Sequence, residues 1–176
     1  ILQVDGFEAD DIIGTIAHKA DLEGIDTFMV TPDKDYGQLV TDRIHMLKPA
    51  SGKNEAVLMG PAEVNAKWGL QNPSQVVDIL ALMGDASDNI PGCPGVGEKT
   101  ATRLIQEYGS VETLLSSVQT LKGALRQKVE ENAEPIRMSH RMATIRTNVP
   151  LTPDLNSLPL HAPAYAPLQD DHQRPE

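Results

Sequence analysis

Several residue types are scarce in this sequence, and the scarcity of each excludes some classes of protein. There is a single cysteine, Cys93, among 176 residues, so the chain cannot form an internal disulfide, which fits a reducing compartment. Aromatic residues make up only 3% of the chain, so the core must be mostly aliphatic. No apolar run approaches the roughly 18 residues that a membrane span requires, so we expect a globular protein without membrane contact.

Basic residues are also in the minority, with 15 lysines and arginines against 25 aspartates and glutamates and a net charge of −10. Nucleic acids select basic surfaces, so this average taken alone argues against a nucleic-acid partner. The charges are unevenly distributed, however, because residues 95–128 carry five basic and three acidic side chains, a net charge of +2. The acidic balance therefore does not exclude a nucleic-acid partner.

The hydrophobic pattern of the first third predicts an α/β layer. Residues 6–24 carry an apolar stripe at helical spacing, with acidic residues at the start and Gly24 at the end. Residues 25–31 and 43–49 are rich in β-branched and apolar residues and predict two strands. A helix that leads into strands in this order favours a parallel α/β sheet.

From Gly60 onward the pattern becomes helical, and Pro61 and Gly69 are typical of the first position and the end of a helix. Ser110 is a candidate cap for a later helix. We expect helices over residues 60–70, 72–84, 97–109, 110–118, 121–134 and 136–147.

These patterns divide the chain into an α/β part (residues 1–59), a helical part (60–148) and a tail (149–176). The tail is rich in proline and has no periodicity, so we expect it to be disordered. The chain begins on Ile1 rather than on methionine, and we expect it to be a fragment of a longer protein.

Acidic residues form three clusters, "EADD", "DKD" and "DASD", each beside the expected end of a helix or strand. Ligands of open α/β sheets bind beyond the carboxyl ends of the strands, so the clusters could face one edge. Carboxylates that converge there repel one another unless a cation is bound, and oxygen ligands without histidine or cysteine favour Mg²⁺ or Mn²⁺. Two such ions can activate a water molecule and stabilise the leaving oxygen of a phosphodiester. The seven candidate ligands are Glu8, Asp10, Asp11, Asp33, Asp35, Asp85 and Asp88.

Each acidic cluster also has a structural interpretation that stays open. Acids at a helix start are favourable near the helix dipole, so "EADD" can be a first turn. The "DKD" cluster can be a turn that Lys34 neutralises, and "DASD" can be a cap.

The stretch "PGCPGVGEKTA" combines a glycine-rich turn with a lysine. It is not a P-loop, because that motif needs the lysine directly after its last glycine, and here Glu98 separates Gly97 from Lys99. The glycines allow close approach of a phosphate, which the first amides of the next helix could hold. Lys99 and Arg103 are four residues apart and share one helix face. We favour sequence-independent binding of a nucleic-acid backbone over a simple interhelical turn.

Three stretches, "GFEADDIIGTIA", "VTPDKDYGQLV" and "MGDASDNIPGCPGVGEKTATRLIQEYGS", closely resemble the 5′ nuclease domains of bacterial type I DNA polymerases, in the flap endonuclease family. The resemblance extends from about Ile1 to Val149. It implies a PIN-like α/β sheet followed by a helical region with a helix–hairpin–helix (H3TH). The implied activity is metal-dependent 5′–3′ exonuclease and 5′-flap endonuclease cleavage of DNA in replication and repair.

The resemblance also implies roles for individual residues. The aspartates of the three clusters, Asp10, Asp11, Asp33, Asp35, Asp85 and Asp88, match catalytic positions, and together with Glu8 they match the ligands of two Mg²⁺ or Mn²⁺ ions. The matching DNA-binding positions are Gly95, Val96, Gly97, Lys99, Thr100 and Arg103, with a K⁺ ion possible at the hairpin.

The family carries a further N-terminal segment, with one more aspartate ligand and a basic arch, and this chain starts after both. We therefore expect a sheet that is incomplete at its N-terminus, and weak or no activity for the fragment alone. The alternatives are a DNA-binding fragment without catalysis and a PIN-type ribonuclease. The implied partners are double-stranded DNA with a 5′ flap or 5′ end and the polymerase domains of the intact parent chain. We expect a cytoplasmic, nucleoid-associated monomer.

Overall fold

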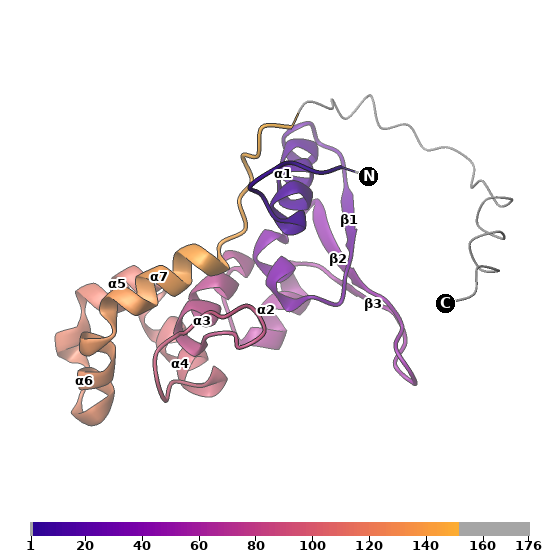
Figure 1. Ribbon diagram of the computed structural model, residues 1–176. Helices are drawn as coiled ribbons and strands as arrows, with labels where there is room; N and C mark the ends of the chain where they lie inside the picture. Colours follow the sequence, from indigo (N-terminus) through magenta and orange to yellow (C-terminus); the bar gives the residue numbers. More distant parts are fainter. Residues whose placement is uncertain (1, 152–176) are drawn as a thin grey trace, which may run out of the picture.

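A three-stranded sheet forms the first part of the computed structural model, which describes residues 2–151 (Figure 1). Strand β1 (Thr27–Val30) pairs in parallel with β2 (Ile44–Lys48), and β2 pairs antiparallel with β3 (Val57–Met59). The predicted parallel pairing of the first two strands is confirmed. The third strand was not predicted, because three residues after an exposed turn carry too short a pattern to read.

The sheet has one buried and one exposed face, because successive side chains of a strand point to opposite sides. Met29, Met46 and Met59 lie in register across the three strands and are at most 7% exposed. They pack into the core together with Ala17 of helix α1 (Ala9–Leu22). The opposite face carries exposed apolar residues, among them Phe28, Val30 and Leu58.

The other elements are helical, and they lie largely where the sequence predicted helices. The helical elements are η1 (Lys34–Leu39), α2 (Pro61–Trp68), η2 (Pro73–Gln75), α3 (Val76–Met83), α4 (Glu98–Tyr108), α5 (Val111–Ser116), η3 (Val118–Thr120), α6 (Gly123–Glu131) and α7 (Ala133–Ala143). Ser110 caps α5 as predicted, since its Oγ accepts the N–H of Thr113 at 3.2 Å. The predicted helix over residues 72–84 divides into η2 and α3, because Asn72 caps a separate short turn at Pro73.

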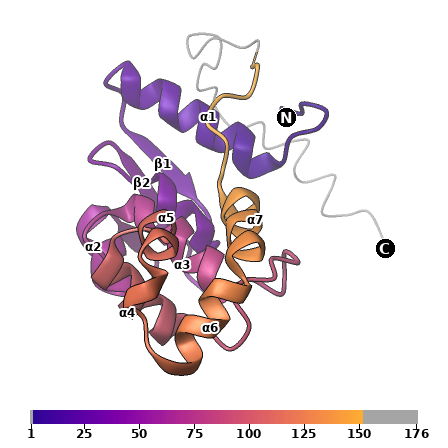
Figure 2. The same cartoon turned by 90° about the vertical axis from the view of Figure 1, so that its left-hand side faces the viewer.

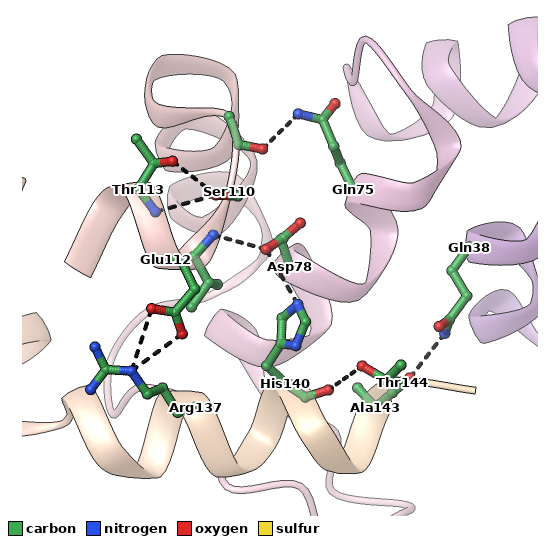
Figure 3. A network of polar contacts seen from close by, with 12 residues as sticks. Gln38, Gln75, Asp78, Ser110, Glu112, Thr113, Arg137, His140, Ala143 and Thr144 are labelled. Atoms are coloured by element: carbon green, nitrogen blue, oxygen red, sulfur yellow. Dashed lines mark hydrogen bonds and ion pairs between the residues drawn. The ribbon is translucent and has the colours of Figure 1, made fainter. Parts of the chain in front are cut away.

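Helix α3 is the centre of the helical region and packs against α4, α5 and α7 (Figure 2). Its residues from Val76 to Leu82 are all buried, which suits a helix that is apolar on nearly every side. The one acid among them, Asp78, accepts the N–H of Val111 at 2.8 Å and lies 3.5 Å from His140 Nε2, so it joins α3 to α5 and α7 (Figure 3).

After α7 the chain returns to α1 in a segment that we call the return segment, residues 144–149 (Figure 1). Thr15 Oγ1 accepts the N–H of Val149 at 3.0 Å, and Val149 is buried. Gly14 of α1 makes the close approach possible, because a Cβ there would lie 2.8 Å from Ile145 Cγ2. The return segment therefore fixes the helical region to the α/β layer.

No helix among the described residues is long and apolar enough to cross a membrane. The predicted boundary between residues 59 and 60 lies between β3 and α2, and a functional division there stays a prediction. The disordered tail was predicted from residue 149, and its residues 152–176 lie outside the described part of the chain.

Candidate metal centre and DNA-binding hairpin

Three aspartates from two distant parts of the chain form a carboxylate cluster. Asp35 lies in η1, directly after β1, while Asp85 and Asp88 lie in the turn after α3. One carboxylate oxygen of each lies within 4.8 Å of the others. The turn is closed by two backbone hydrogen bonds between Asp85 and Ile90, of 2.9 and 2.8 Å, and Asn89 takes a left-handed conformation with φ of 56°. This local structure directs Asp85 and Asp88 toward η1.

Asp35 is the member of the cluster whose surroundings most clearly fit a cation. Its Oδ1 is buried and has no hydrogen-bond partner among residues 2–151. Burial, followed by the charge of Asp33, raises the pKa of Asp35 to about 6. A buried carboxylate oxygen without a partner is costly, and an oxygen-binding cation would remove the cost. The donor set of the cluster therefore fits a hard divalent ion.

Lys34 is the cation that contacts the cluster in the structure. Its Nζ donates a hydrogen bond to Asp85 Oδ2 and lies 4.0 Å from Asp35 Oδ1. This hydrogen bond raises the pKa of Lys34 and lowers the pKa of Asp85. From the sequence alone, Lys34 could neutralise its two neighbours in "DKD", Asp33 and Asp35. In the structure it donates its hydrogen bond to Asp85, which is 51 positions away.

The remaining predicted acids lie around the same space. A cleft of about 750 Å³ is lined by the carboxylate-bearing residues Glu8, Asp10, Asp11, Asp33, Asp35 and Asp88. Asp85 does not line the cleft, but it joins the others through the cluster. The three sequence clusters therefore meet on one side of the molecule, as predicted, although their role as ligands stays a prediction.

Asp10 and Asp11 are adjacent but lie in different surroundings. Both oxygens of Asp11 accept backbone N–H groups, Oδ1 from Arg146 at 2.7 Å and Oδ2 from Glu8 at 3.4 Å. Asp10 accepts only the N–H of Asp11 among the described residues, and burial raises its pKa. Asp11 thus fastens the return segment to α1, while Asp10 keeps an oxygen for a ligand. The pairing of Glu8 with Asp11 agrees with the first-turn interpretation of "EADD".

Two cleft residues were not predicted from the sequence. Arg141 of α7 and Arg146 of the return segment line the cleft beside the acids. Arg146 also lies 5.5 Å from the ring of Phe7. The sequence holds no local pattern that identifies them, because their position depends on a contact between residues 135 positions apart. Guanidinium groups in this position are well suited to bind a phosphate group.

The predicted hairpin residues Gly95, Val96 and Gly97 lie in a turn that leads into α4. Gly95 has φ of +76°, a conformation that favours glycine, and Lys128 Nζ of α6 lies where its Cβ would be. Val96 is only 3% exposed, and its N–H donates to the carbonyl oxygen of Cys93 at 2.9 Å, so this residue belongs to the core. Gly97 has open space around it and precedes α4, whose first N–H groups have no partner within the helix.

The side chains predicted to bind DNA follow on α4. Lys99 and Arg103 are exposed, and Thr100 is half-buried. Lys99 and Arg103 line one groove, so the helix face predicted for them is confirmed, while binding stays a prediction.

Comparison with known proteins places this geometry in a family. Residues 1–69 match the family model described as 5′–3′ exonuclease, N-terminal resolvase-like domain, and residues 71–166 match 5′–3′ exonuclease, C-terminal SAM fold. The thermostable DNA polymerase I of Thermus aquaticus is 44% identical over 153 residues, which cover 87% of this chain and 18% of that protein. DNA polymerase I of Bacillus subtilis is 41% identical over 157 residues, covering 89% of this chain and 18% of that protein. The chain thus spans less than a fifth of these relatives.

Solved structures show the same fold. A variant of the T5 5′-exonuclease has a TM-score of 0.72 at 21% identity, covering 83% of this chain and 58% of that one. The T5 D15 flap endonuclease, solved as a pseudo-enzyme–product complex with DNA and metal ions, has a TM-score of 0.73 at 21% identity, covering 83% of this chain and 53% of that one. The fold class predicted from the sequence is confirmed. With both parts matched by its family models, this chain belongs to the 5′–3′ exonuclease family.

Proposed function

We propose that the chain is part of a metal-dependent 5′ nuclease that hydrolyses phosphodiester bonds at the 5′ ends and 5′ flaps of DNA, within a DNA polymerase I. The observation that carries the proposal is the convergence of Asp35, Asp85 and Asp88 within 4.8 Å, with a buried oxygen of Asp35 that lacks a partner among the described residues. Membership of the 5′–3′ exonuclease family supports this interpretation over an unrelated acidic site.

The acids of the cleft are the proposed ligands of two Mg²⁺ or Mn²⁺ ions. Asp35, Asp85 and Asp88 form one group, and Asp10 and Asp33 line the cleft beside them. When bound, such ions supply an activated water and stabilise the leaving oxygen of the phosphodiester. The guanidinium groups of Arg141 and Arg146 bind the phosphate at the cleft and orient it toward the carboxylates.

The hairpin is the proposed anchor for the duplex. The backbone of Gly95 and Gly97 and the first amides of α4 bind phosphate oxygens, while buried Val96 holds the turn in the core, and hairpin carbonyls could bind a K⁺ ion. Lys99, Thr100 and Arg103 add contacts to the same backbone, so binding is independent of sequence and weakens as salt rises.

Cleavage of a labelled 5′-flap duplex tests the proposal. We expect product from the intact parent protein with Mg²⁺ but not with Ca²⁺, and loss of product in its Asp85→Asn variant. The exposed acid Asp42 gives a matched control, Asp42→Asn, which should cleave like the unaltered chain. An unlabelled single-stranded RNA competitor should not suppress cleavage, and RNA cleavage in preference to flap DNA would contradict the proposal.

A second candidate is DNA binding without cleavage. Two observations favour it: Lys34 pairs with Asp85 inside the cluster, and both oxygens of Asp11 are engaged by backbone N–H groups. In the same assay this candidate predicts a salt-dependent mobility shift and no product with either metal.

A further inference from the structure

A second, smaller groove is lined by the end of α2 and by one face of α4. Its volume is about 290 Å³. The residues that line it are Lys67, Trp68 and Gly69 on one side and Glu98, Lys99, Thr102, Arg103 and Gln106 on the other. Lys67 and its neighbours at the end of α2 have no part in the predicted hairpin.

The groove gathers basic side chains that lack acidic partners. Within residues 2–151, no carboxylate lies within 4.0 Å of the charged groups of Lys67, Lys99 or Arg103. Elsewhere, Arg126 and Arg137 are each paired with glutamates. Glu98 is the one acid among the groove residues, so the lining carries a positive balance.

Lys67 is held in place by an aromatic ring rather than by a carboxylate. Its Nζ lies 4.7 Å from the ring centroid of Trp68, which is only 4% exposed. Partial burial and the neighbouring Lys48 lower the pKa of Lys67, and Lys34 acts in the same direction. An anion beside Lys67 would relieve this repulsion, because like charges at short range disfavour the charged form.

A hydrogen bond from a side chain to a backbone carbonyl joins the two walls of the groove. Gln106 Nε2 donates to the carbonyl oxygen of Gly69 at 2.6 Å, which joins α4 to the end of α2. Gly69 has φ of +64° and ends α2 in a left-handed conformation. Lys67 and Arg103 therefore line one groove whose two walls are connected.

We propose that this groove is a second phosphate-binding site, which takes the sugar–phosphate backbone of the DNA beyond the nucleotides held by the hairpin, with Lys67 and Arg103 as its contacts. The proposal rests on the proposed function, since the DNA reaches the groove along α4, whose first turn belongs to both sites. A free nucleotide offers the same phosphate chemistry, and the experiment separates the two sources.

Fluorescence anisotropy of a labelled 5′-flap duplex, in Ca²⁺ and over about 50–200 mM salt, tests the proposal. We expect Lys67→Ala to bind about five- to tenfold more weakly at 0.1 M salt, and its slope of log affinity against log salt to fall by about 0.9. Lys67→Arg should restore both values. The matched control is Lys53→Ala, in the turn between β2 and β3 that projects away from the helices (Figure 1), and it should be unchanged.

The outcomes separate this proposal from the proposed function. If Lys99→Ala weakens binding while Lys67→Ala behaves like Lys53→Ala, the groove proposal is overturned and the proposed function stands. If the unaltered chain does not bind flap DNA at all, both are overturned. A deoxynucleoside monophosphate could compete with the duplex only when Lys67 is present, while Lys67→Ala leaves duplex binding unchanged. That result would overturn the assignment of the groove to DNA.

Discussion

Lys34 offsets part of the negative charge of the carboxylate cluster. Its ammonium group contacts Asp85 and approaches Asp35, so it supplies a positive charge where a divalent ion would bind. The two aspartates respond differently, because only Asp85 receives the hydrogen bond while Asp35 stays buried beside Asp33. A metal ion must therefore compete with Lys34 for Asp85.

Replacing Lys34 tests this competition. Lys34→Met removes both the competing donor and a nearby positive charge, so we expect Mg²⁺ or Mn²⁺ to bind about three- to tenfold more tightly, the size expected for one ion pair at a partly exposed site. Isothermal titration calorimetry measures the affinity, and Lys53→Met, which changes an exposed lysine in a turn, is the control. Equal affinities in the two variants would show that Lys34 does not compete.

The raised pKa of Asp35 predicts a pH effect on stability. Because the folded pKa of about 6 lies above the usual aspartate value near 3.9, ionised Asp35 destabilises the fold. This contribution is absent below about pH 4, grows as the pH rises through 6, and reaches about 1–3 kcal/mol. In EDTA, Asp35→Asn should thus unfold at a higher temperature than the unaltered chain at pH 7.5, and at the same temperature at pH 4. Asp42→Asn should show no such divergence, and a constant difference at both pH values would contradict the prediction.

At the scale of elements, η1 and the return segment together hold the cleft in shape. Gln38 Nε2 donates to the carbonyl oxygens of Asp35 at 3.1 Å and Ala143 at 2.9 Å (Figure 3), and Gln38 Oε1 accepts the N–H of Ile145 at 3.0 Å. One amide thus connects the end of α7 to the turn that carries Asp35. The cleft depends on this connection as much as on the sheet.

The contact between Gly14 and the return segment can be tested with a double-mutant cycle. Alanine in the middle of a helix normally stabilises by up to about 1 kcal/mol over glycine. Here the new Cβ would lie 2.8 Å from Ile145 Cγ2, so we expect Gly14→Ala to lower the free energy of unfolding by about 1–3 kcal/mol.

Urea unfolding measures the effect in two backgrounds. In a chain that already carries Ile145→Ala, the clashing atom is gone, and Gly14→Ala should be neutral or stabilising. A loss of the same size in both backgrounds would show that Ile145 is not the cause.

The sequence was most informative where local chemistry determines an element. The cap at Ser110, the helix start at Pro61 and the β-branched and apolar residues of 25–31 and 43–49 each act within a few residues, and the corresponding caps and strands are present. The meeting of the three acidic clusters was also predictable, because each lies beside the end of a helix or strand.

The rest depends on contacts between distant residues. The pairing of Lys34 with Asp85, the inward side chain of Val96 and the placement of Arg141 and Arg146 are set by tertiary packing. No pattern within a short stretch can reveal them. The roles of the acids as ligands stay a prediction.

At the scale of the whole molecule, the outer face of the sheet is unusually apolar. Phe28 and Val30 of β1 and Leu58 of β3 lie on this face and are each half exposed or more, between 50% and 67%. Val30, Leu47 and Leu58 lie in register across the three strands, so these side chains form one continuous patch. Exposed apolar patches on a sheet bind apolar probes and partners.

This patch predicts binding of a hydrophobic dye to the folded chain. Charged residues on the exposed face, as in the double variant Val30→Lys with Leu58→Lys, should reduce native-state fluorescence of 1-anilinonaphthalene-8-sulfonate by more than half, with little change in the melting temperature. Met138→Lys replaces a similarly exposed apolar residue on α7 and should leave most of the signal. Undiminished fluorescence in the double variant would place the dye elsewhere.

The return segment also has a consequence for how the chain is made. Asp11 and Thr15 receive their partners from residues that are 135 and 134 positions later, so α1 cannot complete its packing while the ribosome is still adding the helical region. Asp11 is thus synthesised long before its partner in the return segment, and a chain arrested before Val149 would carry an unfinished cleft.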